Sequence, residues 1–174
     1  MSEIAANKDA APKAMRIKSI TTDYDQDEDR IFLAVVDAAN NRCKLWLTRR
    51  LTERLVSALV NGLDIPSEDQ VLPEATIQAA QIYAQLEARI SQRPAARVVV
   101  EESATQGLVH QIKIKTADND VRVIEFYCKS VEKSADPVEL VLTPAELRQW
   151  LEVLRATPAK SQWREDIWPE WLKR

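Results

Sequence analysis

Glycine is almost absent from this chain, which has two glycines, Gly62 and Gly107, in 174 residues. Loops that hold phosphate with consecutive backbone amides need several glycines, because a side chain would keep the backbone away from the ligand. The sequence also lacks a long alternation of strands with single helices. These absences exclude a glycine-rich phosphate loop and a dinucleotide-binding fold.

Cysteine and histidine are scarce as well. Cys43 and Cys128 lie far apart in predicted strands, and His110 is the only histidine. A zinc site needs a close-spaced set of ligands, and nucleophilic catalysis needs a base beside the nucleophile. Neither pattern is present, so we predict no metal site, no cofactor and no enzymatic activity. The two cysteines are expected to be free thiols in a reducing compartment.

No charge of one sign dominates, since 24 lysine and arginine residues face 27 aspartate and glutamate residues. Binding to a phosphate backbone favours an excess of basic residues, so this balance argues against nucleic acid as the main partner. No apolar run is long enough to span a membrane, and residues 1–14 lack the apolar core of a secretory signal. We therefore predict a disordered leader at 1–14 and a cytoplasmic location.

Two changes of apolar spacing organise the rest of the chain. Residues 43–47 alternate between apolar and other side chains as a strand does, whereas from Leu51 onward leucine recurs every four residues as on a helix face. Thr48 stands at this change as a predicted N-cap. The second change is at Thr143, where Pro144 and Glu146 provide a proline in the first turn and a capping box.

These patterns predict an α+β fold: an antiparallel sheet or flattened sandwich of about seven strands, with an inserted helical hairpin and a C-terminal helix. A single domain covers residues 15–158. Its halves, about 15–63 and 97–156, each place three strands before a helix and are joined by a helix at 73–92. Duplication of one unit and recurrence of a common strand-to-helix turn explain this similarity equally well. The predicted strands lie at 15–22, 30–36, 43–47, 97–102, 110–115, 121–128 and 139–142.

Thr48, Arg49 and Arg50 are a candidate anion site. Two arginines in the first turn of a helix oppose the positive end of its dipole, and a bound phosphate or carboxylate would offset this repulsion. The acidic run at 23–29 is the alternative partner for both arginines. This run is not a calcium loop, because its sixth and twelfth positions carry Glu28 and Ala34.

The tail at 159–174 is rich in tryptophan. Such an aromatic surface will not remain in water, so the tail either folds back on its own domain or docks on another subunit or partner. The residues that would make these contacts are Trp163, Ile167, Trp168 and Trp171.

Residues 45–52, with the sequence Leu-Trp-Leu-Thr-Arg-Arg-Leu-Thr, resemble a segment in a family of small uncharacterised proteobacterial proteins. That resemblance implies no function. The order of elements is similar to the head domains of end-joining scaffold proteins and of the centriole assembly factor, which are dimerising scaffolds. This second resemblance implies self-association.

Our first hypothesis is a non-enzymatic protein-interaction or scaffold module. It would form a homodimer, or bind a protein partner, through its apolar central strands or its tryptophan tail. The alternative is a single-stranded nucleic-acid binder, because strand-rich halves that end in a helix resemble the purine-rich-element-binding repeat. The basic and aromatic sheet face for that function would comprise Lys113, Lys115, Arg122, Tyr127 and Lys129.

Overall fold

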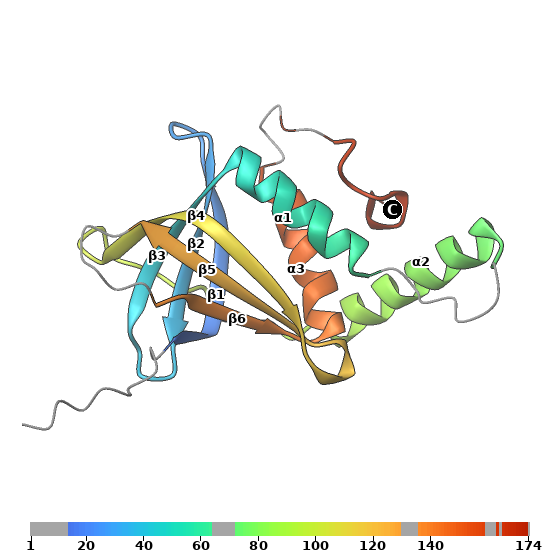
Figure 1. Ribbon diagram of the computed structural model, residues 1–174, viewed down its shortest axis with the longest axis horizontal. Helices are drawn as coiled ribbons and strands as arrows, with labels where there is room; N and C mark the ends of the chain where they lie inside the picture. Colours follow the sequence, from blue (N-terminus) through green and yellow to red (C-terminus); the bar gives the residue numbers. More distant parts are fainter. Residues whose placement is uncertain (1–13, 64–71, 130–135, 159–162, 164, 174) are drawn as a thin grey trace, which may run out of the picture.

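A computed structural model describes residues 14–63, 72–129, 136–158, 163 and 165–173. Most of the predicted leader at 1–14 and parts of the tail therefore lie outside the described residues. The fold is α+β, as predicted, with a β-barrel on one side of the molecule and helices on the other (Figure 1).

The described residues contain six strands and four helices. The strands are β1 (Met15–Asp25), β2 (Arg30–Asp37), β3 (Arg42–Thr48), β4 (Thr105–Thr116), β5 (Arg122–Lys129) and β6 (Val138–Leu142). The helices are α1 (Arg49–Asn61), α2 (Glu74–Ser91), α3 (Pro144–Ala156) and α4 (Glu170–Lys173), with a short 3-10 turn at Asp118–Asp120.

The prediction of about seven strands in an antiparallel sheet or flattened sandwich is wrong. The six strands close into a barrel in chain order, and the pairs β3–β4 and β1–β6 are parallel. Residues 97–102, predicted to be a strand, form no ladder. The amide of Val98 instead donates to Thr21 Oγ1 at 2.8 Å, and Arg97 forms an ion pair with Asp23. Side-chain contacts therefore hold this apolar segment against β1.

The two halves of the barrel repeat the same order of elements. Each half is an antiparallel meander of three strands followed by a helix, β1–β3 with α1 and β4–β6 with α3. The two parallel strand pairs, which we call seams, have the same register. At the β3–β4 seam Cys43 pairs with Thr105, and at the β6–β1 seam Val138 pairs with Met15. Each of these pairs joins the start of the last strand of one half to the start of the first strand of the other half.

Both capping predictions are confirmed. Thr48 Oγ1 accepts a hydrogen bond from the Leu51 amide at 3.3 Å, and Thr143 Oγ1 accepts one from the Glu146 amide at 3.3 Å. The Glu146 carboxylate accepts in turn from the Thr143 amide at 2.8 Å, which completes the capping box. These caps turn the chain from sheet to helix at matching places in the two halves.

The core lies between the inner wall of the barrel and the helices α1 and α3. Side chains from both halves are fully buried there, so the two halves share one core. They include Ile31, Leu33 and Leu47 from the first half and Ile124, Phe126, Leu147 and Leu151 from the second.

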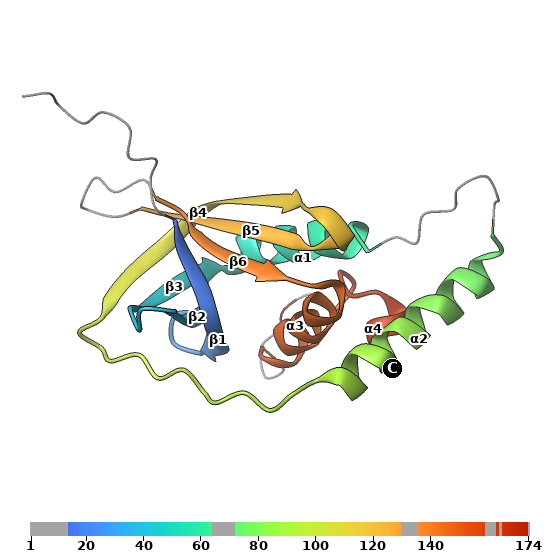
Figure 2. The ribbon, with the colours of Figure 1, turned by 90° about the horizontal axis from the view of Figure 1, so that it is seen from below.

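The helices α1 and α2 form a hairpin-like insertion between β3 and β4, in agreement with the predicted helical hairpin. The helix α2 packs against α3 and α4 rather than on the sheet, and it extends away from the barrel (Figure 2). Its position leaves one long side of the helix without a neighbour in the described part of the chain.

Candidate functional site

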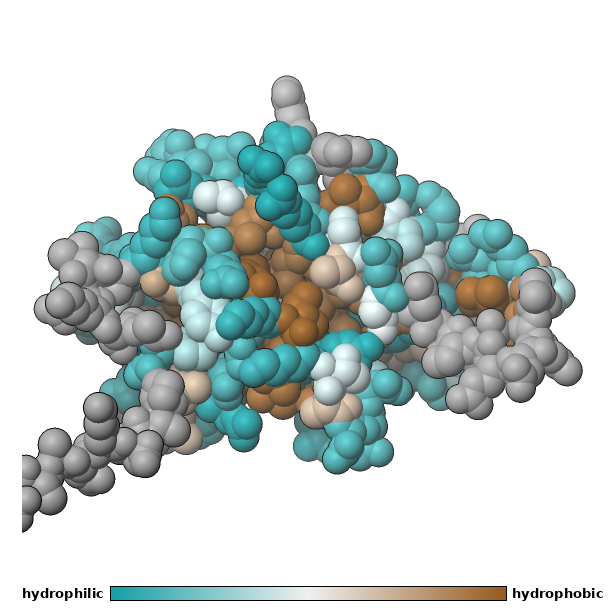
Figure 3. Space-filling model, in the orientation of Figure 1, coloured by the Kyte–Doolittle hydropathy of each residue, from teal (hydrophilic) through white to brown (hydrophobic). Residues whose placement is uncertain are grey.

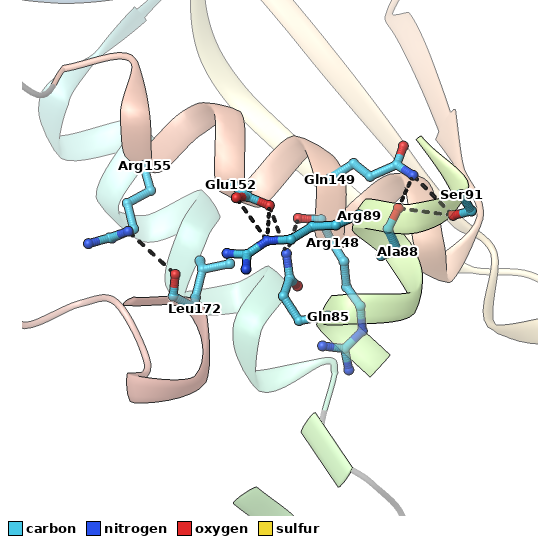
Figure 4. A network of polar contacts seen from close by, with 9 residues as sticks. All are labelled: Gln85, Ala88, Arg89, Ser91, Arg148, Gln149, Glu152, Arg155 and Leu172. Carbon is cyan, nitrogen blue, oxygen red and sulfur yellow. Dashed lines mark hydrogen bonds and ion pairs between the residues drawn. The ribbon is translucent and has the colours of Figure 1, made fainter. Parts of the chain in front are cut away.

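The helix α2 packs against α3 through polar side chains (Figure 4). Gln85 Nε2 donates to Glu152 Oε2 at 3.1 Å, and Arg89 Nε forms an ion pair with the same carboxylate at 3.0 Å. From the α3 side, Gln149 Nε2 donates to the carbonyl of Ala88 at 2.6 Å. Directional hydrogen bonds therefore fix the position of α2, and they cover its polar side.

A buried arginine completes this interface. Arg148 of α3 is 6% exposed; it donates to the side-chain oxygen of Gln81, and its guanidinium lies 4.9 Å from the ring centroid of Trp171. Burial lowers the pKa of the Arg148 guanidinium. Gln81, Gln85 and Ala88 of α2 thus face the domain, and Ile82 packs against the edge of the core. Leu86 and Ile90 point away from it.

The apolar side of α2 faces solvent. Tyr83 is 63% exposed, Leu86 50% and Ile90 77%, and Ala75 and Ala79 are exposed along the same helical stripe. Figure 3 shows apolar surface on the part of the molecule where α2 projects. An amphipathic helix normally buries its large apolar side chains, so the outward direction of Tyr83, Leu86 and Ile90 is the reverse of the usual one, although Ile82 packs inward.

The tryptophan tail lies on its own domain, which is the first of the two alternatives we considered for it. Trp168 and Trp171 are 7% and 6% exposed and belong to the hydrophobic core, while Ile167 packs against its edge. Arg155 Nη1 of α3 also donates to the carbonyl of Leu172 at 3.4 Å. These aromatic side chains are therefore covered within the chain.

Trp163 contacts the turn between β1 and β2. Its Nε1 donates to Asp29 Oδ1 at 2.7 Å, and the Tyr24 hydroxyl donates to the same oxygen at 2.6 Å. The Tyr24 and Trp163 rings meet edge to face with centroids 5.9 Å apart. The hydrogen bond from Tyr24, then that from Trp163, lowers the pKa of Asp29 below its ordinary value of 3.8, and Arg49 adds to this effect.

Acid should loosen the contact of Trp163. Because the folded pKa of Asp29 lies below 3.8, its stabilising effect is present above about pH 4 and is lost as the pH falls through the folded value. We expect the indole NMR signal of Trp163 to shift below about pH 4. Asp29→Asn removes the ionisation and should remove this shift; the same pH profile in both proteins would contradict the assignment.

The structure separates the residues of the predicted anion site. Arg49 forms an ion pair with Glu53 at 3.0 Å, and its guanidinium lies 5.9 Å from the ring centroid of Trp163. Arg50 lies on another side of α1, where Thr48 lines the same groove. The acidic turn therefore provides a partner for Arg49 through Asp29, but not for Arg50.

Arg50 belongs to a groove of about 360 Å³ between the start of α1 and the strands β4 and β5. Two of its basic members, Arg54 and His110, were not predicted from the sequence. The spacing of four between Arg50 and Arg54, which places both on one helix face, was the available signal. The groove is lined by Thr48, Arg50, Leu51, Arg54, Leu108, Val109, His110 and Lys129.

The residues of the predicted nucleic-acid face do not form one basic surface. Lys115 forms an ion pair with Glu125, whose other oxygen accepts from the Tyr127 hydroxyl at 3.0 Å. The bond from Lys115 lowers the pKa of Glu125. Arg122 is 8% exposed and donates to the carbonyl of Gly62, so it has a structural role.

The two remaining members of that face also lie apart. Lys113 Nζ is 4.8 Å from the ring centroid of Tyr127, and Lys129 lines the groove beside α1. The outer face of β4 and β5 therefore carries mixed charge, with one carboxylate among its cations.

Both cysteines are free thiols, and burial raises the pKa of Cys43 to about 11. The described residues contain no group of three or more histidine, cysteine or acidic side chains that could hold a metal ion. Within the same ranges, no helix is long and apolar enough to cross a membrane.

Comparison of the chain with protein-family models, with curated proteins and with solved structures found no match.

Proposed function

We propose that this chain is a self-associating interaction module that forms a homodimer through the outward face of α2. The observation that carries the proposal is the reversed orientation of this helix, which buries Gln81 and Gln85 and exposes Leu86 and Ile90. Exposed apolar surface of this kind favours association with another protein surface. The continuous strands and the tryptophan tail, our first candidates for the interface, are covered by the chain itself.

The stripe on α2 is complementary to itself. Its N-terminal half presents the small residues Ala75 and Ala79, and its C-terminal half presents the large residues Leu86 and Ile90. In an antiparallel pair with a second copy, Ile90 meets Ala75 and Leu86 meets Ala79, on both sides of a two-fold axis near Tyr83. Large side chains then fill the space above small ones, as close helix packing requires.

Two-fold symmetry doubles the free energy that burial of each residue contributes to the dimer. Burial of a leucine or isoleucine side chain is favourable by about 1.5–3 kcal/mol, and an interface with a two-fold axis buries each such side chain twice. The same symmetry makes a single substitution act twice. Changes in this stripe should therefore have larger effects on the dimer than on the folded monomer.

We predict that Leu86→Glu and Ile90→Glu each convert a dimer into a monomer. Each substitution places two carboxylates in the apolar contact, where the cost of removing a charge from water is high. Sedimentation velocity over a range of concentrations would measure the mass. The matched control is Val99→Glu, because Val99 is 64% exposed but lies outside α2.

The proposal fails if the unaltered chain remains monomeric at high concentration, or if Val99→Glu disrupts the dimer as strongly as the α2 variants. The helix orientation has its own test. A chain with Ala79→Cys and Leu86→Cys should form an intermolecular disulfide under mild oxidation, whereas Ala79→Cys with Ile90→Cys should cross-link much less. The opposite preference would exclude the antiparallel arrangement.

A further inference from the structure

We infer that the groove between the start of α1 and the strands β4 and β5 binds a compact phosphate-bearing ligand, such as a phosphate ester or a diphosphate. This site lies on the barrel rather than on α2, so it is independent of self-association. Four cationic or hydrogen-bond-donating side chains from three separate elements line it: Arg50 and Arg54 of α1, His110 of β4 and Lys129 at the end of β5.

The cations of this groove have no acidic partner among the described residues. In the described part of the chain, no acidic side chain pairs with Arg50, Arg54 or Lys129, and none lines the groove. Other basic residues have acidic partners, such as Arg16 with Glu139, Arg89 with Glu152 and Lys115 with Glu125. In a chain of net charge −3, this concentration of unpaired cations favours an anion from outside the chain.

The fold does not require these cations, as the second half of the barrel demonstrates. At equal spacing after the two capping threonines, Ala145 of α3 corresponds to Arg50, and Gln149 corresponds to Arg54. The same backbone thus forms without either arginine. Gln149 makes a structural hydrogen bond to α2, whereas in the described residues Arg54 makes none.

The surroundings limit the size of the ligand. Beyond Leu108 the surface continues into a second hollow, which is lined by three carboxylates, of Asp25, Glu28 and Glu102, and by two cations, Arg30 and Lys44. A polynucleotide that crossed from one hollow to the other would meet these carboxylates, of which Glu28 is paired with Arg30 at 3.2 Å. An anion short enough to remain in the first groove avoids them.

The nearby aromatic side chains do not offer a free stacking surface. Lys44 Nζ lies 4.3 Å from the ring centroid of Trp46, and Trp46 Nε1 donates to Gln106 at 2.9 Å. Bases of a single strand stack on exposed aromatic faces, and here Lys44 covers Trp46, which lines the second hollow. Arginine forks, in contrast, bind the oxygens of a phosphate in pairs, and Leu51 and Leu108 supply apolar contact for the rest of a small ligand.

The test is a titration of the full chain with pyrophosphate, followed by the backbone amide NMR signals. We expect saturable shifts centred on Arg50, Arg54, His110 and Lys129, and weaker binding of inorganic phosphate at the same signals. Added salt should reduce the affinity, because the contact is between charges near the surface. The absence of saturable shifts with both probes would overturn the inference.

Charge reversal provides the matched comparison. Arg50→Glu with Arg54→Glu should weaken pyrophosphate binding by about tenfold or more, since two charge-assisted contacts are lost. Lys18→Glu with Arg93→Glu changes the net charge equally at exposed positions elsewhere and should leave binding unchanged. If both variants lose the same amount of pyrophosphate affinity, the net charge of the chain explains the loss and the groove does not. If the same NMR signals report tighter binding of a single-stranded oligonucleotide than of pyrophosphate, the inference that the ligand is compact is overturned.

Discussion

Replacement of Phe126 by alanine is expected to lower the free energy of unfolding by about 3–5 kcal/mol. Phe126 is fully buried in β5, where it pairs with Ile112 of β4 and with Val138 of β6. Its ring belongs to the core that the barrel wall shares with α1 and α3. Truncation removes these contacts and leaves a cavity, because close-packed neighbours relax only in part.

Tyr127→Ala is the matched control, since Tyr127 is the next residue of the strand and points to the outer face of the barrel. Its hydroxyl bonds to Glu125, and its side chain is partly exposed. We expect a loss of about 1 kcal/mol for this variant. Urea unfolding followed by circular dichroism would measure both losses, and a larger loss for Tyr127 than for Phe126 would contradict the inward and outward faces assigned to β5.

Trp171→Ala should also cost about 3–5 kcal/mol. Trp171 is 6% exposed in α4, and its ring contacts the buried guanidinium of Arg148. Its removal takes away both the apolar contact and a covering surface for that charge. The loss should lower the denaturation midpoint. It should also weaken the packing of α2, because Arg148 donates to Gln81 of that helix.

Trp163→Ala, in the same tail, serves as the comparison. Trp163 is partly exposed and is held by one hydrogen bond to Asp29 and by contacts with Tyr24 and Arg49. We expect a loss of about 1–2 kcal/mol, which differential scanning calorimetry would resolve from that of Trp171→Ala. Equal stabilities for Trp171→Ala and the unaltered chain would mean that the tail does not belong to the core.

The strand-to-helix joints could be predicted because their causes are local. Thr48 and Thr143 cap the helices that follow them, and the apolar residues after each cap recur at the helical period. The same local rule placed α3, including the capping box at Glu146. Contacts within four residues determine these features, so the sequence pattern contains them.

Closure of the barrel could not be predicted in this way. The parallel seams join residues that are distant in the sequence, Cys43 with Thr105 and Met15 with Val138. Apolar alternation identifies the faces of a strand but not its neighbours. The apolar residues at 97–102 looked like a further strand for the same reason, although Val98 bonds to the side chain of Thr21.

The candidate surfaces were predictable only in part. A helix at 73–92 was predicted, but the direction of its apolar side chains depends on partners of Gln81 and Gln85 that lie on α3. For the anion groove, Thr48 and Arg50 were identified from the helix start. Arg54 was in the same helix, whereas His110 and Lys129 joined them only through the parallel pairing of β3 with β4.

The seam between β1 and β6 has a consequence for biosynthesis. Met15 leaves the ribosome well before its partner Val138, so the first meander must wait with its outer strands unpaired. During this interval the nascent chain is exposed to intermolecular strand pairing. Folding rate should therefore depend on late, long-range closure, and chaperone demand should be greatest just before β6 emerges.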